Sequence, residues 1–441
     1  MNTHVRIGAG ALVLVACGPG AGNSVAHTPA SEADGAAAGG VSTSQDGSAE
    51  STVPEAGTSA PEQDAAVVIA HCTGTPKSMP SSPAPTLTPG TWVNISAKSV
   101  PFGGDDGTNA GDHVYAQGLA VDPCNPAVLY QTVSGFNGTN NTVEPSGGLY
   151  KTTNAGSTWT KIGPMDEPIN IRIDPGNSQH LYAGDGVRGN TSGFWVSNDG
   201  GATWAIPAGF ASAAKTVSCN DVYHVSPDPA NFNHVLVSFH NPWNNGNVVG
   251  DGGTLTAGVL ESFDGGNTWT IHNPPAGWSG AYGYDVFFLS NPALGIGDGK
   301  TWLYGTQGKG YWRTADAGQT WTQVSTNDMK HGGSQTYYTA SGTLYVGGSP
   351  NILQSSDNGL TFKGVTPVPS QGFIGITGDG TTLYTGATTT GPMLTSTDGV
   401  AWHSFNSQQF NDGPFELSYD ATDRIVYAAI WLGGTWALQL N

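Results

Sequence analysis

Short apolar segments alternate with polar, glycine-rich turns along most of this chain. Segments such as Gly118–Val121 and Ile171–Ile173 end in a turn that contains proline, and a second short apolar segment such as Leu181–Gly184 follows. Apolar runs of about 4 to 8 residues bounded by Gly, Pro and Asp are typical of strands. The pattern therefore predicts an all-β chain in which helix is nearly absent.

One turn of the form Ser/Thr-x-Asp-x-Gly-x-Thr-Trp recurs after these segments. Its copies run Thr152 to Trp159, Ser197 to Trp204, Ser262 to Trp269, Thr314 to Trp321, Ser355 to Phe362 and, one residue shorter, Ser396 to Trp402. Their aromatic ends lie 45, 65, 52, 41 and 40 residues apart. Such a period is typical of a β-propeller with one four-stranded blade per repeat.

The third residue of each repeated turn has a structural role in this interpretation. These residues are Asn154, Asp199, Asp264, Asp316, Asp357 and Asp398. A carboxylate at this position can accept backbone N–H bonds across the hairpin while Gly takes a positive φ, so the turn closes without strain. The following Trp begins the outer strand, and we expect its ring to pack between neighbouring blades.

The end of the chain predicts a seventh blade that the N-terminal part completes. Residues 424–430 and 434–440 supply strands, but no repeated turn follows them. Thr91–Ser96 is similar to the Trp-bearing outer strand Thr158–Gly163. We therefore predict a single seven-bladed β-propeller over residues 81–441, closed by an N-terminal strand that leaves no open edge.

The repeated turn resembles the Asp box, or BNR repeat, of the sialidase, xyloglucanase and sortilin-like superfamily. The resemblance implies that these turns lie between the third and fourth strands, away from the ligand. Sialidases need three arginines around the substrate carboxylate, and beyond the signal this chain has only Arg172, Arg188, Arg313 and Arg424, so sialidase chemistry is disfavoured. Val121–Pro126 and Gly148–Thr152 look more like the two-domain xyloglucanases. Those enzymes place paired Asp residues between two propellers, so their catalytic residues cannot be transferred to one propeller.

The first residues predict export and a lipid anchor. Arg6 precedes the apolar stretch Ile7–Ala16, and Leu14–Cys17 resembles a bacterial lipobox, in which the signal is cut before a Cys that is then acylated. The alternative is an ordinary signal peptide cleaved nearby. We expect residues 1–17 to be the signal, with lipidation at Cys17, and residues 18–80 to be a disordered tether rich in Ala, Gly, Ser, Thr and Pro. The protein is then held at the bacterial cell envelope, facing the periplasm or the exterior.

The net charge disfavours two classes of partner, and the cysteine count limits the disulfides and metal sites. The 33 acidic and 14 basic residues give a net charge of −19, which opposes binding to nucleic acid or to an anionic membrane surface. After Cys17 there remain Cys72, Cys124 and Cys219, so at most one disulfide joins these three and one thiol is left over. Their spacing fits no zinc pattern, and we predict no metal and no cofactor. The pairing and the oligomeric state stay open.

Candidate ligand-binding residues gather where the inner strands begin. In propellers this face, opposite the repeated turns, surrounds the mouth of the central channel. Two enlarged loops, Ser134–Ser146 and Asn241–Thr256, belong to it. Within a ring of acids and imidazoles that also holds Arg172 and Glu416, the candidate catalytic residues are Asp221, His224, Tyr284 and Asp285. The candidate substrate-binding residues are Trp243, Trp278, His113, Glu167, His331 and Asp412, with the Trp rings as stacking platforms.

Three classes of function remain open at this point. The first is action on an extracellular polysaccharide, as a glycosidase or a lyase that uses acids with a His or Tyr. The second is a non-catalytic propeller that binds a glycan or a protein. The third is an assembly factor that resembles the single-propeller photosystem assembly proteins. Two carboxyl groups about 5 to 10 Å apart at the channel mouth would favour hydrolysis.

Overall fold

The computed structural model describes residues 84–102, 114–137, 142–186, 189–243, 256–274, 284–330, 333–368, 371–410 and 412–441. All of them belong to one of the two compact units into which the chain divides. The predicted signal, the tether and Cys17 lie outside the described residues. Within the described part, no helix combines the length and apolar character needed to cross a membrane.

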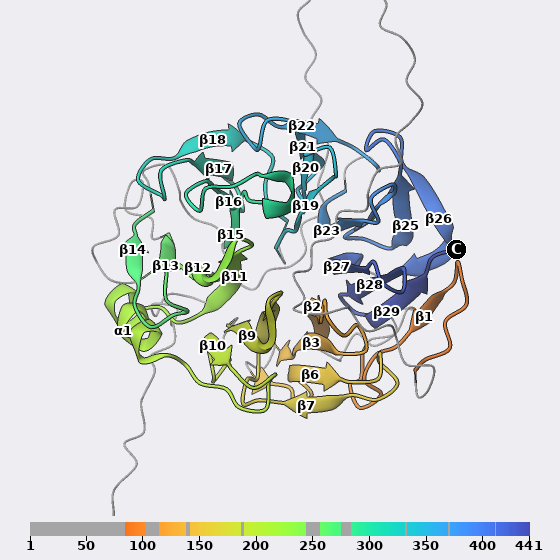
Figure 1. Cartoon of the computed structure of the whole chain (residues 1–441), viewed down its shortest axis with the longest axis horizontal. Coiled ribbons are helices and arrows are strands. Elements are labelled where there is room, and N and C mark those ends of the chain that lie inside the picture. The colour runs from red at the N-terminus through yellow and green to blue at the C-terminus, as the bar shows by residue number, and fades with distance from the viewer. Residues whose placement is uncertain are drawn as a thin grey trace, which may run out of the picture. The chain divides into compact units, whose positions relative to one another are not determined.

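Seven antiparallel sheets form the blades of a β-propeller, as the sequence predicts, and they follow one another around a ring in chain order (Figure 1). Blade 1 contains β2 (Tyr115–Val121), β3 (Leu129–Ser134), β6 (Gly148–Thr152) and β7 (Thr160–Ile162). Blade 2 contains β8 (Pro168–Asp174), β9 (Asn177–Asp185) and β10 (Gly193–Ser197). Blade 3 contains β11 (Val222–Asp228), β12 (Asn231–Phe239), β13 (Val259–Ser262) and β14 (Thr270–His272). Blades 4 and 5 contain β15 (Tyr284–Phe288), β16 (Trp302–Thr306), β17 (Gly310–Thr314) and β18 (Thr322–Ser325); and β19 (Thr336–Tyr338), β20 (Leu344–Val346), β21 (Ile352–Ser355) and β22 (Lys363–Val365).

The last two blades complete the ring. They contain β23 (Phe373–Gly378), β24 (Leu383–Ala387), β25 (Gly391–Ser396) and β26 (His403–Phe410); and β27 (Pro414–Asp420), β28 (Ile425–Ile430), β29 (Gly434–Gln439) and the N-terminal β1 (Trp92–Asn94). In the seventh blade β1 pairs with β29, with Trp92 opposite Leu438 and Asn94 opposite Trp436. Figure 1 shows the orange β1 beside the dark blue β29. The predicted closure by an N-terminal strand is thus confirmed.

The repeated turn closes through a compact set of hydrogen bonds. In the third blade Ser262 Oγ donates to Asp264 Oδ1 (2.9 Å), and Asp264 Oδ1 also accepts the N–H of Thr268 (2.8 Å). Gly266 has a φ of 94° and donates its N–H to Ser262 Oγ (2.8 Å). The bond from the backbone to the carboxylate or amide oxygen recurs in the other copies. Polar residues within the turn therefore satisfy most of its backbone, and the N–H of Gly265 donates to Asn233 O (2.9 Å) just before the neighbouring strand pairing begins.

Blade 2 departs from the four-stranded pattern. After its repeated turn only a single bridge, Val196 to Ala205, stands in place of an outer strand. The helix α1 (Ala208–Val217) follows and packs Phe210 and Val217 into the core between this blade and blade 3. A short hairpin of β4 (Phe136–Asn137) and β5 (Thr142–Val143) lies in the first enlarged loop, and a 3₁₀ turn, η2, covers Pro292–Leu294.

Neither described cysteine is a free thiol. Cys124 lies in the turn after β2 and Cys219 lies just before β11, and both are disulfide-bonded. The thiol that the odd count leaves over is therefore at neither position. Cys72 lies outside the described residues.

Candidate functional site

The inner strands are joined to one another by polar side chains at the mouth of the central channel. A β-bulge interrupts β8 between Pro168 and Asn170, β11 between Val222 and His224, and β27 between Pro414 and Glu416. The residue after each bulge bonds to the next blade. The bonds are Asn170 Nδ2 to Tyr223 O (2.8 Å), His224 Nδ1 to Val286 O (2.9 Å), and Leu119 N–H to Glu416 Oε2 (2.8 Å). Bulges thus aim polar side chains across the blade boundaries.

Polar side chains also join blades 1 and 2, blades 4 and 5, and blade 5 with blades 6 and 7. Asp285 Oδ2 accepts the N–H of Ser334 (2.6 Å) between blades 4 and 5. Gln335 reaches two blades, because its Oε1 accepts the N–H groups of Ile376 (3.0 Å) and Leu417 (3.1 Å). Thr132 Oγ1 donates to Ile169 O (3.1 Å) between blades 1 and 2. Several polar residues of the channel mouth therefore have a structural role, because they bond neighbouring blades to one another.

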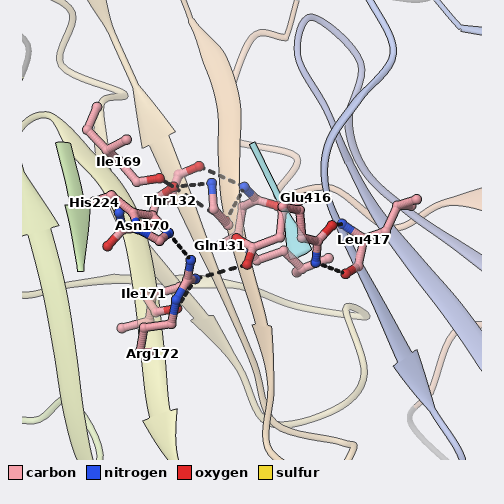
Figure 2. Close-up of polar contacts among 12 residues, drawn as sticks. Gln131, Thr132, Ile169, Asn170, Ile171, Arg172, His224, Glu416 and Leu417 are labelled. Carbon is pink, nitrogen blue, oxygen red and sulfur yellow. Dashed lines mark hydrogen bonds and ion pairs between the residues drawn. The ribbon is translucent and has the colours of Figure 1, made fainter. Parts of the chain in front are cut away.

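Arg172 lies at the centre of this network. Its Nη1 donates to Glu416 Oε1 (2.9 Å) and to the backbone oxygen of Ile171 (2.9 Å). Its Nη2 lies 3.0 Å from His224 Nε2. Figure 2 shows the guanidinium between Glu416 and His224, which come from blades 7 and 3. Because the oxygen of Val286 can only accept, His224 carries its proton on Nδ1, and Nε2 accepts the bond from Arg172.

Burial and charge set the protonation of these groups. Burial, together with the neighbouring Arg172, lowers the pKa of His224 to about 3, so this imidazole is neutral. Burial raises the pKa of Asp285 to about 7, although the N–H of Ser334 and the charge of Arg172 act in the opposite direction. Burial also raises the pKa of Glu416 against the effect of Arg172. Asp285 can therefore carry a proton near neutral pH.

These residues line a cavity of about 350 Å³ in the channel. Most of its wall comes from the inner strands β2, β8, β11, β15 and β27 and from β19 with the residues just before it, and the rest from Pro229 and residues 290–292. The lining residues include Gln117, Arg172, His224, Asp285, Phe415 and Glu416. The cavity thus brings two carboxyl groups and an ion-paired guanidinium together with an aromatic ring. Within the described ranges, no group of three His, Cys, Asp or Glu residues could hold a metal ion.

The structure places the four candidate catalytic residues in different surroundings. Asp285 and His224 line the cavity, but both ring nitrogens of His224 are engaged. Asp221 is 2% exposed and does not line the cavity; it binds Asn241 Nδ2 and lies 3.4 Å from His240 Nδ1. Asp221 and Asp285, both candidate catalytic residues, therefore do not line one common cavity. Tyr284 begins β15, and its side chain lies outside what the structure describes.

Most of the predicted substrate-binding residues are elsewhere. The prediction for Trp243 as a stacking platform is wrong, because its ring is fully buried and packs edge-on against Phe239 at 5.5 Å. Glu167 is also fully buried and accepts bonds from Ser134 Oγ (2.5 Å) and Gly135 N (2.9 Å). Asp412 is half-buried but is not part of the cavity wall. Trp278, His113 and His331 lie outside the described residues.

Arg172 and Glu416 lie at the centre of the polar network in the channel. Both belonged to the predicted polar ring, but neither was chosen as a site residue. They are 244 positions apart in sequence, and only ring closure brings them within 2.9 Å. Their signal was positional, since each lies in an inner strand that begins at the channel mouth.

The chain is similar in sequence to curated xyloglucanases. It is 27% identical to the xyloglucanase of Hypocrea jecorina over 296 residues, which cover 58% of this chain and 33% of that protein. It is 27% identical to a xyloglucanase of Paenibacillus sp. over 286 residues, which cover 55% of this chain and 26% of that protein. The chain thus spans at most 33% of the length of these two relatives.

Solved structures share the architecture. The extracellular domain of a hybrid two-component system from B. thetaiotaomicron aligns with a TM-score of 0.50 at 12% identity, covering 73% of this chain and 39% of that chain. At this identity the likeness shows the fold alone. No family model matches the chain.

Proposed function

We propose that this propeller binds an extracellular polysaccharide at the mouth of its central channel. The observation that carries the proposal is the cavity of about 350 Å³, where Asp285, Glu416 and Arg172 line the same wall as the ring of Phe415. Carboxyl and guanidinium groups can bind sugar hydroxyls, while an aromatic ring offers an apolar surface to a sugar face. The similarity to xyloglucanases supports a polysaccharide as the ligand.

A second candidate function, hydrolysis of the bound glycan, is favoured by one specific observation. Asp285 has a pKa of about 7 and shares the cavity with Glu416, which is ion-paired with Arg172. Glycoside hydrolysis needs one carboxyl group that carries a proton and a second that is ionised. In this proposal Asp285 donates its proton to the leaving sugar oxygen as the glycosidic bond breaks, and Glu416 takes a proton from the water that attacks the anomeric carbon. His224 positions Arg172 through its Nε2 and transfers no proton.

The location of the protein is part of the same proposal. Extracellular polysaccharide is accessible only to an exported protein, and the lipobox-like Leu14–Cys17 provides both export and an anchor. A tether of residues 18–80 would then hold the propeller away from the membrane, so that the channel mouth can meet a polymer.

The test is a screen of the purified protein against neutral and acidic polysaccharides. Retention on an affinity gel and the release of reducing ends are measured on the same samples. We expect retention by a neutral polysaccharide such as xyloglucan. If the protein is also a hydrolase, Asp285→Asn should lower reducing-end release by about 100-fold or more while retention persists.

Asp316→Asn is the matched control, because Asp316 belongs to the same blade but lies in the repeated turn. This variant should behave like the wild type in both assays. Failure of every polysaccharide to retain the wild-type protein would overturn the proposed function. Retention without any release of reducing ends would leave binding as the function and remove hydrolysis.

A further inference from the structure

Three aromatic rings form a continuous stack where the seventh blade meets the first. Trp431, in the turn between β28 and β29, lies between Tyr115 of β2 and Phe415 of β27. Its ring centroid is 4.3 Å from that of Tyr115 and 4.2 Å from that of Phe415, and both pairs are tilted by only 19°. The backbone oxygen of Trp431 accepts the N–H of Ala116 (2.9 Å), which fixes the turn against β2. The stack is therefore a fixed part of the channel mouth.

All three rings are half-buried, so part of each remains exposed outside the hydrophobic core. Trp431 has a ring on each of its two faces, whereas Phe415 is covered by Trp431 on one face and also lines the cavity. Phe415 is thus the end of the stack that a ligand in the cavity can touch. Trp431 and Tyr115 hold its orientation from behind.

An independent feature beside the stack points to a ligand with a hydrogen-bond donor. Gln117 lies in the bulge of β2, lines the same cavity and is 7% exposed. Its Oε1 is buried and has no hydrogen-bond partner among the described residues. A buried acceptor without a partner costs free energy, because it has lost its bonds to water. A hydroxyl donor from a bound molecule would remove that cost.

We propose that Phe415 and Gln117 form a subsite for one pyranose ring of a neutral polysaccharide. This inference rests on the proposed function and locates it at the boundary of blades 7 and 1. A pyranose has an apolar face of C–H groups, which stacks on the Phe415 ring, and a rim of hydroxyls, one of which donates to Gln117 Oε1. Trp431 and Tyr115 are positioning residues, since they act on the sugar only through Phe415.

The neutral character of the sugar follows from the charges of the cavity wall. Arg172 is the cation of that wall, and its guanidinium already binds Glu416, the oxygen of Ile171 and His224. A sugar carboxylate would meet the carboxylate of Glu416, and the charge of Arg172 is already compensated by that group. Like charges in one cavity disfavour binding, and the net charge of −19 adds to the effect.

The experiment measures the affinity of the full-length protein for xyloglucan oligosaccharides and for cellohexaose by isothermal titration calorimetry. A pectin-derived oligogalacturonide serves as the acidic probe. Phe415→Ala should weaken binding of the neutral probes by about 10-fold or more, because it removes a buried aromatic contact. Gln117→Met keeps the size of the side chain and should weaken binding by about 3- to 10-fold, the effect of one hydrogen bond.

Two further variants make the result specific. Phe263→Ala removes a ring that is 61% exposed in a repeated turn, at the opposite end of its blade, and should leave affinity unchanged. If Phe415→Ala fails to fold, Phe415→Leu keeps an apolar side chain but loses the flat ring and should still weaken binding. Wild-type binding that persists unchanged in Phe415→Leu and Gln117→Met would overturn the subsite but not the proposed function. Tighter binding of the acidic probe would overturn the neutral class, and no binding of any probe would overturn both proposals.

Discussion

Replacing Trp92 by alanine should strongly destabilise the propeller. Trp92 belongs to β1, the strand that closes the seventh blade, and its side chain is only 4% exposed. Its ring meets Phe410 of the sixth blade edge-on, with centroids 5.6 Å apart at 87°. It also belongs to the buried cluster that contains Trp436 and Leu438. The ring therefore connects the closing strand to two blades.

The expected loss follows from this burial. Truncation of a buried Trp to Ala costs about 3 to 5 kcal/mol, because both transfer free energy and packing are lost. Domains are stable by only about 5 to 15 kcal/mol, so this one change removes a large part of the free energy of unfolding. Trp92→Phe should cost much less. The buried Nε1 of Trp92 has no hydrogen-bond partner among the described residues, so its removal breaks no bond.

Urea denaturation followed by intrinsic fluorescence measures both variants against the wild type. A second arm compares two truncations, because removing residues 1–70 spares β1, whereas removing residues 1–96 deletes it. The shorter truncation should leave the melting temperature nearly unchanged, and the longer one should lower it strongly. If Trp92→Ala stays within about 1 kcal/mol of the wild type, or if the two truncations melt together, closure by β1 does not stabilise the ring.

Three further predictions concern other parts of the chain. Asp264→Ala should lower the free energy of unfolding by about 1 kcal/mol in a thermal melt, since the turn loses the bonds from Ser262 and Thr268. Asp264→Asn should cost less, because Asn154 accepts the equivalent bonds in blade 1. Equal losses in the two variants would contradict this prediction. His234 lies 3.3 Å from Asp228 Oδ2 and 2.9 Å from Glu261 Oε1, and although burial alone lowers its pKa, these two bonds raise the pKa above 6.5. The stabilisation that protonated His234 gives is therefore complete below pH 6.5 and is lost as pH rises through the raised pKa. The difference in free energy of unfolding between wild type and His234→Gln, about 2 kcal/mol, should thus shrink from pH 6 to pH 9 in urea titrations. A constant difference would refute the charge on His234. Cys17→Ser should move the protein from the membrane fraction to the soluble fraction if Cys17 is lipidated, and unchanged fractionation would exclude that anchor.

Local sequence determined the turns and, through their spacing, the number of blades. Each repeated turn is closed by side chains within its own few residues, as Ser262, Asp264 and Thr268 are, so its chemistry can be read without the fold. The closure was also predictable, because the last blade lacked an outer strand and Trp92 lay in a segment similar to one. The missing outer strand of blade 2 was not, since the turn that precedes α1 has the same residues as the others.

Only the tertiary structure decided which polar residues meet in the channel. A bulge between Val222 and His224 changes which side chains of β11 face the channel, and a bulge leaves no clear mark in the sequence. Asp221 and His224 thus have different surroundings although they are three positions apart. Trp243 precedes a polar, Asn-rich segment, a pattern that favours an exposed ring. In the structure the ring is fully buried in the core beside β12.

The ion pair of Arg172 with Glu416 and the stack of Tyr115, Trp431 and Phe415 have the same origin. The ion pair joins blade 7 to blade 2 and the stack joins blade 7 to blade 1, so both exist only once the ring has closed. Within its own strand or turn, each of these residues has no local pattern that distinguishes it from its neighbours in sequence. Their chemistry comes from neighbours that are distant in sequence, because the closed ring brings the last blade beside the first and within contact of the second.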